Sequence, residues 1–481
     1  MTETWSTSAG LDLHLELAGT RPRAGLEAAL REAVRSGTLA AGTALPSSRA
    51  FARDLGIARN TVAQAYAQLV AEGWLAARHG SGTWVAERVR PLIAANAAAS
   101  QAAVRGARYD LRPGVPDVAA FPRAAWLAAA RKALAAAPAK DLSYADPRGL
   151  EVLRVALAEY LGRARGVSIT PDRIVVCAGF AQGLELLCEV LRGAGKRALA
   201  VEAYGHSGHR RIAASAGMWL TALPVDERGA VVSALPGAAG AASQAKRPEA
   251  AGAVLLTPAH QFPLGVVLAP DRRRQVAGWA ARTRGVVIED DYDGEFRYDR
   301  QAVGALQPLA PEHVVYAGTA SKSLAPGLRL GWLALPERLA ADVVAAKSSV
   351  GRLSSSVDQL TLAELIRSGG YDRQVRRARL AYRQRLERLA SALARQVPEV
   401  RVTGIAAGLH AVLRLPAGLA EDDVIARAAA RGLAVQGLAD NRAGAQDLGP
   451  ALVVGYATPP AHAFSTALAR LCAVLKEAVA G

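Results

Sequence analysis

The strongest constraint on the fold is an alternation of short apolar runs and longer helical stretches that begins at Tyr109. The apolar runs have the character of buried β-strands and occupy residues 174–177, 198–201, 254–256, 286–288, 314–316 and 330–335. Strands separated by helices favour an α/β fold with a mainly parallel sheet that is covered by helices on both faces. Ligands of such sheets gather at the loops beyond the strand ends, so candidate site residues are expected there.

One of these loops contains an isolated lysine. Lys322 follows the run at 314–316 among small and hydroxyl residues, and Arg329 comes shortly after it. A lysine amine becomes a nucleophile towards an aldehyde when burial or neighbouring cations let it lose its proton. The hydroxyls of Thr319 and Ser321 and the guanidinium of Arg329 suit a phosphate monoester. The stretch predicts a site for pyridoxal 5'-phosphate with a Schiff base on Lys322, and an exposed loop lysine is the alternative.

A second strand end offers a place for a phosphate. The run at 174–177 leads through a glycine into an apolar helix, and the residues at this junction are Gly179, Phe180, Ala181 and Gln182. Free backbone N–H groups and the helix dipole favour an anion at such a position. An ordinary strand-to-helix turn without a ligand is the alternative, because turns of this kind are common in α/β proteins.

A third strand end carries acidic residues and a phenol. The run at 286–288 continues into Glu289, Asp290, Asp291 and Tyr292. A carboxylate against a pyridine nitrogen keeps that nitrogen protonated, and a phenol can hydrogen-bond the ring hydroxyl. We therefore assign Asp290 to the nitrogen and Tyr292 to the hydroxyl, and a solvated acidic loop is the alternative.

The N-terminal part has a different pattern. Apolar residues recur at helical spacing from about 23 to 37, a second short helix runs to Leu55 from a cap at Ser47 or Ser48, and a third runs from Arg59 to about Gly73. Two short strands around a glycine hairpin follow at 74–85. A hairpin after a helix-turn-helix is a wing, so this arrangement predicts binding to double-stranded DNA. A generic three-helix module is the alternative.

The start of the third helix is the end that normally enters the major groove, while neighbouring loops contact phosphates. The residues predicted to contact DNA are Ser48, Arg49, Arg59, Asn60, Thr61, Gln64, Arg78, His79, Gly80, Ser81 and Gly82. A net charge of +16 and a pI near 10.2 permit a polyanionic partner without proving one.

The composition divides the chain into three parts. Residues 12–86 contain the helix-turn-helix and wing, residues 87–108 are an alanine-rich linker, and residues 109–481 form the cofactor-binding part. The three cysteines are scattered without metal-binding spacing, so no metal site is predicted. Neither a signal peptide nor a membrane-spanning run is recognisable, and a cytoplasmic protein is expected.

The segments together resemble a known family. Residues 36–86, SGTLAAGTALPSSRAFARDLGIARNTVAQAYAQLVAEGWLAARHGSGTWVA, are similar to the winged helix-turn-helix of GntR-family transcription regulators. The segments TPAHQFPLGVVL (257–268), IEDDYDGEF (288–296), YAGTASKSLAPGLRLGW (316–332) and YADPRGLEVLRVALAEYL (144–161) are similar to those of fold-type I aminotransferases. Over about residues 23–470 the chain resembles the MocR subfamily of GntR regulators, which joins these two domains.

The resemblance implies features that the residues alone do not give. It implies a small C-terminal α+β subdomain and a head-to-tail homodimer in which Tyr144 reaches the phosphate of the neighbouring subunit. An ungapped match places His206 at the aromatic position expected to stack on the cofactor, with Tyr204 as the alternative; a surface position for either also remains open.

Two departures from the aminotransferase pattern bear on function. Phe262 stands where an asparagine usually supports the ring hydroxyl, and Val453 stands where an arginine usually binds the substrate carboxylate. A charge-assisted pair of that kind is worth about 1.5–3 kcal/mol per hydrogen bond, so amino-acid recognition is expected to be weak unless His410 or Arg210 substitutes.

The sequence therefore predicts a transcription regulator that binds pyridoxal 5'-phosphate and responds to it. With the carboxylate arginine missing, the cofactor itself is the favoured signal, which would resemble the PdxR branch that controls genes of vitamin B6 metabolism. Two alternatives stay open, an amino acid or amine as the effector and a working aminotransferase that carries a DNA-binding domain. An isolated half-reaction is compatible with all three.

Overall fold

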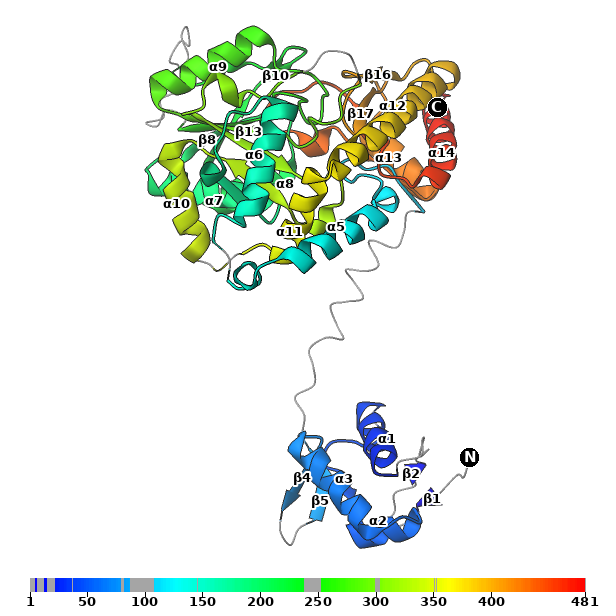
Figure 1. The fold of residues 1–481 in the computed structure, drawn as a ribbon. Coiled ribbons are helices and arrows are strands. Elements are labelled where there is room, and N and C mark those ends of the chain that lie inside the picture. The colour runs from blue at the N-terminus through cyan, green and yellow to red at the C-terminus, as the bar shows by residue number, and fades with distance from the viewer. Residues whose placement is uncertain are drawn as a thin grey trace. The chain divides into compact units, whose positions relative to one another are not determined.

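The chain consists of two compact units, Met1–Arg105 and Gly106–Gly481, which we describe separately (Figure 1). The computed structural model describes residues 5–6, 13–14, 22–36, 38–78, 82–86, 108–144, 146–237, 252–298, 303–349, 351 and 353–480. The predicted linker at 87–108 lies outside these ranges except for Arg108. Within them, no helix is both long and apolar enough to cross a membrane.

The N-terminal unit combines three helices with a three-stranded antiparallel sheet of order β3-β5-β4. Its elements are α1 (Pro22–Ser36), α2 (Ser48–Asp54), α3 (Arg59–Ala71), β3 (Ala44–Leu45), β4 (Leu75–Arg78) and β5 (Gly82–Val85), with a separate pair β1 (Trp5–Ser6) and β2 (Leu13–His14). One core joins the helices to the hairpin through buried residues such as Leu26, Phe51, Leu69 and Val85. The predicted winged helix-turn-helix is confirmed, and the sequence missed β3 because a strand of two residues has no periodicity.

The start of α2 depends on one hydroxyl. Ser47 is the residue before the helix, and its Oγ accepts a hydrogen bond of 3.2 Å from the Ala50 N–H. Gly56 then turns the chain towards α3 with a φ of 65°, a left-handed conformation that suits glycine. Of the two predicted capping serines, Ser47 is therefore the one that caps the helix.

The larger unit is organised around a seven-stranded sheet. Its strands in spatial order are β7 (Ile174–Cys177), β15 (Gly331–Ala334), β14 (Val314–Thr319), β13 (Val286–Asp290), β12 (Ala253–Leu256), β8 (Ala198–Glu202) and β9 (Trp219–Leu223). All neighbouring pairs are parallel except those of β15, which is antiparallel to both β14 and β7. The predicted mainly parallel sheet is confirmed. The sequence missed the edge strand β9, in which Trp219 is exposed.

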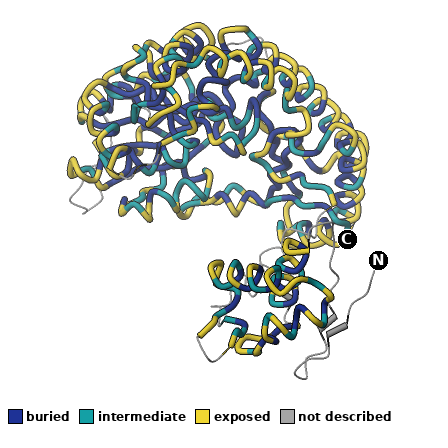
Figure 2. The backbone as a smooth tube through the Cα atoms, turned by 60° about the horizontal axis from the view of Figure 1, so that its bottom comes forward, coloured by how far each residue is buried: buried dark blue, intermediate teal, exposed yellow. Residues whose placement is uncertain are grey.

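Both faces of this sheet are covered by helices. Side chains alternate between the two faces, so that Ile174 and Val176 join a core with α6 (Glu151–Arg165) and α11 (Ser356–Arg367), while Val175 and Cys177 join a core with α7 (Phe180–Gly193) and α10 (Glu337–Ser349). Figure 2 shows the buried chain enclosed by more exposed helices. The other helices around the sheet are α5 (Arg123–Ala136), α8 (Ser207–Ser215) and α9 (Pro270–Thr283).

The C-terminal part forms a smaller layered structure. Strands β16 (Arg401–Thr403), β17 (His410–Arg414), β20 (Ala451–Gly455) and β19 (Gln436–Gly437) make an antiparallel sheet. It packs in one core with α12 (Gly370–Gln396), α13 (Glu421–Ala430) and α14 (Ala461–Ala480). A parallel pair of β18 (Leu433–Ala434) with β6 (Tyr109–Asp110) ties the beginning of the unit to this part. The expected C-terminal α+β subdomain is present.

Short elements complete the described chain. They are the hairpin β10 (Val225–Asp226) and β11 (Gly229–Ala230) and the 3₁₀ helices η2 (Val118–Ala120), η3 (Ala139–Leu142), η4 (Pro171–Arg173), η5 (Val232–Ala234), η6 (Gln307–Leu309), η7 (Pro326–Leu328) and η8 (Ala439–Asn441). Most lie in the connections between successive strands, whereas η2 and η4 connect a strand and a helix.

Candidate functional site

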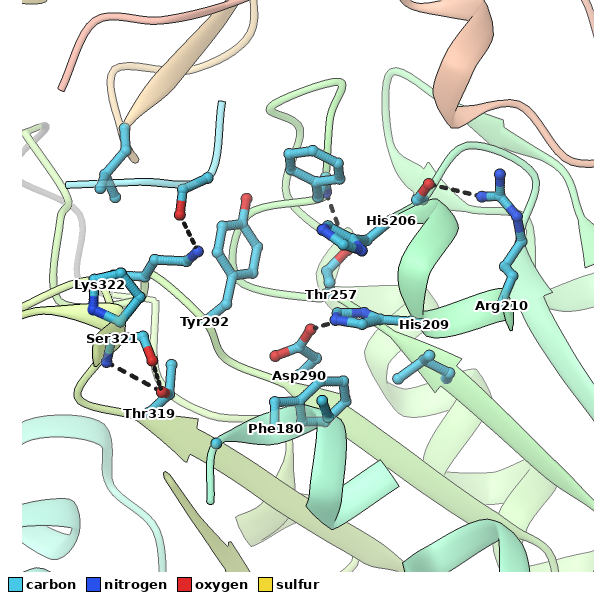
Figure 3. Close-up of a pocket in the computed structure, with 18 of the residues that line it drawn as sticks. Phe180, His206, His209, Arg210, Thr257, Asp290, Tyr292, Thr319, Ser321 and Lys322 are labelled. Carbon is cyan, nitrogen blue, oxygen red and sulfur yellow. Dashed lines mark hydrogen bonds and ion pairs between the residues drawn. The ribbon is translucent and has the colours of Figure 1, made fainter. Parts of the chain in front are cut away.

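A cavity of about 240 Å³ lies where loops meet beyond the ends of the central strands (Figure 3). Ten of the predicted cofactor-binding residues line it, namely Gly179, Phe180, Ala181, His206, Asp290, Tyr292, Thr319, Ser321, Lys322 and Arg329. They come from the ends of β7, β8, β13 and β14 and from the loop before β15, which are far apart in the sequence. The topology of the sheet is what brings them together.

Lys322 places an amine in this cavity. It follows β14, and its Nζ donates a hydrogen bond to the carbonyl oxygen of Gly114. Burial lowers the pKa of Lys322, and the nearby carboxylate of Asp290 acts in the opposite direction. A buried amine with a lowered pKa holds its proton weakly, which is what attack on an aldehyde requires.

Asp290 is the last residue of β13 and is only 4% exposed. Burial raises the pKa of Asp290 well above its ordinary value, and Lys322 counteracts this. Its Oδ2 lies 3.7 Å from Nδ1 of His209, a ring whose pKa is lowered well below the ordinary value by burial. The Asp290 carboxylate is therefore desolvated and faces a neutral imidazole, so a cationic ring nitrogen placed beside it would be strongly favoured.

One side of the cavity suits a phosphate. The hydroxyl oxygens of Thr319 and Ser321 lie 2.9 Å apart, and Arg329 adopts a left-handed backbone conformation with a φ of 52°. Gly179 precedes α7 with a φ of 81°, and a Cβ at this position would lie 3.5 Å from an Arg329 guanidinium nitrogen. Two hydroxyls, a guanidinium and a helix N-terminus thus surround the same space.

A stack of rings forms another wall. The His206 and His209 rings are stacked with centroids 4.4 Å apart, and Phe180 meets His209 edge-on at 4.7 Å. His206 also caps the start of α8, where its Nδ1 accepts a hydrogen bond of 3.1 Å from the Gly208 N–H. The alternative residue Tyr204 is buried away from the cavity, since its hydroxyl donates to the Gln446 carbonyl oxygen at 3.2 Å.

The sequence did not identify His209, although it lies three residues after His206 on the same helix face. This helical spacing is a signal that could have revealed it. Gly114, whose carbonyl oxygen accepts from Lys322, was also missed, and nothing in its local sequence points to the site.

Two predicted cofactor residues do not line the cavity. The Oε1 of Gln182 accepts a hydrogen bond of 2.8 Å from the Ala178 N–H, and the side chain lies in a neighbouring surface hollow. Gln182 thus supports the turn before α7. Tyr144 is 96% exposed in the single chain. Its expected contact is with a second subunit, so this assignment remains a prediction.

The position of the missing carboxylate arginine is closed to ligands. Val453 is fully buried in β20, opposite Val412, in an apolar cluster that also contains Leu264. The possible substitute Arg210 lines the cavity, but its guanidinium donates to three backbone carbonyl oxygens, those of Gly205 at 2.7 Å, Asn441 at 2.9 Å and Arg442 at 3.1 Å. Arg210 therefore joins loops around the site.

The second possible substitute, His410, lines the cavity without a charge. Burial lowers the pKa of His410 to about 4, and its Nε2 lies 3.0 Å from the Pro263 carbonyl oxygen. Near neutral pH a neutral imidazole cannot form the ion pair that an arginine would supply.

The pKa of His410 leads to a prediction for stability against pH. In the unfolded chain the imidazole takes up a proton near pH 6.5, whereas the folded protein resists until about pH 4, so protons favour unfolding between these values. Replacing His410 with glutamine removes this effect and keeps a donor for the Pro263 carbonyl. Relative to the wild type, His410→Gln is expected to gain about 2 kcal/mol of stability between pH 7 and pH 4.5.

Urea unfolding of both proteins at the two pH values measures this change. The groups that also titrate, including Glu202, Glu289 and Glu295 with pKa values raised to about 7 by burial, are common to both proteins and largely cancel. An unchanged stability difference between the two pH values would contradict a neutral, buried His410.

The N-terminal unit presents the predicted DNA contacts at its surface. Eight of these predicted residues are described by the structure. Six are exposed, namely Arg49, Arg59, Asn60, Gln64, Arg78 and Gly82, and two are half-buried, namely Ser48 and Thr61. Ala58 before α3 has no side-chain oxygen to cap the helix, so N–H groups of its first turn are open to a phosphate. The predicted wing residues His79, Gly80 and Ser81 lie outside the described residues.

Metal chemistry is not indicated. Across the described ranges, no group of three or more histidine, cysteine, aspartate or glutamate side chains could hold a metal ion. Cys177, Cys188 and Cys472 are buried and free.

Comparison with known families agrees with both units. Residues 111–438 match the family described as "Aminotransferase class I and II", and residues 22–85 match "Bacterial regulatory proteins, gntR family". The central fold is also similar to crystallised LysN, an alpha-aminoadipate aminotransferase of Thermus thermophilus, with a TM-score of 0.68 and 24% identity over 80% of this chain and 96% of that one. The class I and II aminotransferase fold implies dependence on pyridoxal 5'-phosphate.

Full-length relatives share both domains. The "HTH-type pyridoxine biosynthesis transcriptional regulator PdxR" of Corynebacterium glutamicum is 33% identical over 85% of this chain and 86% of its own length. The "Probable rhizopine catabolism regulatory protein MocR" of Rhizobium meliloti is 32% identical over 83% of each chain. The chain therefore belongs to the GntR-family transcription regulators of the MocR type, DNA-binding proteins that carry an aminotransferase-like domain linked to pyridoxal 5'-phosphate.

Proposed function

We propose that pyridoxal 5'-phosphate binds in the cavity around Lys322 and that its presence changes DNA binding by the N-terminal unit. The observation that carries this proposal is a buried amine of lowered pKa, on Lys322, in the same cavity as the desolvated carboxylate of Asp290. When bound, the group supplies an aldehyde for the amine and a ring nitrogen for the carboxylate.

The surrounding residues fit the rest of the group. Arg329, Thr319, Ser321 and the start of α7 would hold the phosphate, because they surround one side of the cavity with donors. Tyr292 would hydrogen-bond the ring hydroxyl, and the His206 ring would cover the ring face. Gly179 leaves room beside Arg329 that a side chain would narrow.

We propose the cofactor itself as the effector. Val453 is buried in an apolar cluster, and Arg210 donates its hydrogen bonds to three backbone carbonyl oxygens. Because His410 is neutral as well, none of these three residues offers a free cation for an amino-acid carboxylate. The name of the Corynebacterium relative connects that protein to pyridoxine biosynthesis. By analogy, this regulator would control genes of vitamin B6 metabolism.

The partner of the N-terminal unit would be an operator in double-stranded DNA, reached in the cytoplasm. The exposed start of α3 would enter the major groove, and Arg49 and Arg78 would contact phosphates.

We further propose a head-to-tail homodimer. Apolar side chains are exposed on α5 and around the end of η3, where Leu127 is 65%, Leu142 is 54% and Tyr144 is 96% exposed. A second copy that covers this face would bury them, which favours association. Tyr144 would then contribute to the neighbouring cavity.

The test is the affinity of the purified protein for DNA from its own promoter region, measured by fluorescence anisotropy with and without pyridoxal 5'-phosphate. A tenfold change in affinity corresponds to about 1.4 kcal/mol of coupling and supports the proposal. Pyridoxine 5'-phosphate is the matched control, because it keeps the ring and phosphate but has no aldehyde.

The alternatives give different results in the same experiment. If DNA affinity changes only after an amino acid or amine is added to the cofactor-loaded protein, that compound is the effector. Sustained transamination between an amino acid and a keto acid would instead indicate an enzyme. An unchanged affinity under all conditions would refute regulation through this cavity.

A further inference from the structure

Beside Tyr292 lies a buried pair of polar residues that the proposed function does not use. Nδ1 of His260 is 2.8 Å from Oδ2 of Asp293 and 3.1 Å from the hydroxyl oxygen of Tyr292. The side chains of His260 and Asp293 are only 2% and 1% exposed. One ring nitrogen therefore serves two oxygens in a nearly water-free environment.

The chemistry of the three groups determines where the protons lie. An aspartate carboxylate can only accept, so Nδ1 of His260 must carry the proton at the 2.8 Å contact. The same N–H then faces the Tyr292 oxygen, which has to act as an acceptor. The hydroxyl proton of Tyr292 then goes either to the Asp293 carboxylate, which is its hydrogen-bond partner within the protein, or to another acceptor. Because Tyr292 lines the cavity, that acceptor can be a ligand.

The packing around the pair leaves little freedom. Phe262 meets the Tyr292 ring edge-on at 6.0 Å and the His410 ring at 5.0 Å, and its side chain has no group that could hydrogen-bond a ligand. Gly408 adjoins the pair so closely that a Cβ there would overlap both the His260 ring and the Asp293 carboxylate. The backbone at Gly408 thus packs directly against His260 and Asp293, and the Phe262 ring packs against the Tyr292 ring.

We propose that His260 and Asp293 are positioning residues that hold the Tyr292 hydroxyl at the cavity, with the His260 Nδ1–H donating to its oxygen, so that a bound ligand takes the Tyr292 proton in place of Asp293. This inference rests on the proposed binding of pyridoxal 5'-phosphate, towards whose ring oxygen the proton would be donated. His260 does not touch the ligand and acts through Tyr292 alone. The pair therefore orients the hydrogen bond from Tyr292 to the ring hydroxyl of the ligand, which Phe262 cannot support because its side chain has no polar group.

Two substitutions of His260 separate positioning from packing. Asparagine can place an N–H close to the position of Nδ1, whereas leucine fills similar space without a donor. His260→Leu is expected to raise the dissociation constant for pyridoxal 5'-phosphate about tenfold and to shift the pH at which the bound cofactor's absorbance changes. Tyr292→Phe should do the same, the double variant should do no more, and His260→Asn should restore most of the affinity.

The position of the proton is tested without cofactor. In protein labelled with ¹⁵N-histidine, the His260 signal, assigned through His260→Asn, is expected to show a protonated Nδ1 and to shift in Tyr292→Phe. A proton on Nε2 would overturn the proposal, as would a folded His260→Leu with wild-type affinity and spectrum, or additive effects with Tyr292→Phe. If the wild type itself binds no cofactor, the proposed function fails, and the NMR result still decides whether the pair holds Tyr292.

Discussion

Lys322→Ala is expected to abolish covalent attachment of pyridoxal 5'-phosphate completely. Lys322 carries the amine in the cavity, and burial lowers its pKa so that the neutral form is accessible. Borohydride reduction of the loaded wild type should fix the cofactor to the chain, as measured by intact mass, whereas the variant should gain no mass. The phosphate contacts from Arg329, Thr319 and Ser321 remain, so weak reversible binding is still expected.

An exposed lysine provides the control for this experiment. Lys476 lies on the surface of α14, and Lys476→Ala should label like the wild type. Labelling of Lys322→Ala at the wild-type level would mean that another lysine reacts and that the cavity has been wrongly assigned. If DNA affinity responds to the cofactor equally in both variants, covalent attachment is not part of the signal.

Two adjacent aspartates are expected to respond to the same substitution in opposite ways. Asp291 forms a bidentate ion pair with Arg165, with Nε–Oδ2 and Nη2–Oδ1 distances of 2.6 and 3.0 Å, and it accepts from the Tyr316 hydroxyl at 2.8 Å. The Arg165 and Asp291 side chains are only 6% and 1% exposed. Asp291→Asn leaves a buried arginine without its counter-charge and should lower the free energy of unfolding by about 3–5 kcal/mol.

Asp290→Asn should change the free energy of unfolding of the cofactor-free protein very little. The pKa of Asp290 is raised well above normal by burial, so its charge is unfavourable in the empty fold, and removing it should leave stability unchanged or slightly higher. Its affinity for pyridoxal 5'-phosphate should fall by about tenfold or more, because the ring nitrogen loses its carboxylate.

Urea unfolding of the cofactor-free proteins, followed by cofactor titration, distinguishes the two aspartates. A loss of stability in Asp290→Asn as large as that in Asp291→Asn would show that both carboxylates are structural. Equal loss of cofactor affinity in two variants that are both fully folded would instead place Asp291 in the site.

Features with a strong local hydrophobic pattern could be predicted from the sequence. The runs that became β7, β8, β12, β13 and β14 are continuous apolar segments, as expected for strands buried on both faces. The run at 330–335 also became a strand, but its antiparallel direction depends on insertion between β14 and β7. Strand direction is a property of the whole sheet and has no local signal.

The lining of the cavity could be predicted where a strand end carries an unusual residue type, as at Lys322 and Asp290. Sequence spacing could not distinguish Gln182, which supports a turn, from Ala181, which lines the cavity one residue earlier. The carbonyl of Gly114 and the pair of His260 and Asp293 depend on contacts between distant segments. Each of these interactions exists only when the sheet has been assembled.

The sheet order also bears on the order in which the protein is made. Strand β7 is the first strand of this sheet along the chain, and its only neighbour among the described strands of the sheet is β15, with Ile174 paired with Ala334. Strand β7 therefore cannot pair until residues that are synthesised much later have left the ribosome. The N-terminal unit completes its core between Leu26 and Val85 with contacts of short sequence separation, which favour rapid folding. On the ribosome, the DNA-binding unit is therefore expected to fold before the aminotransferase-like unit, and a chain truncated between the two would keep a folded helix-turn-helix without the cofactor-binding cavity.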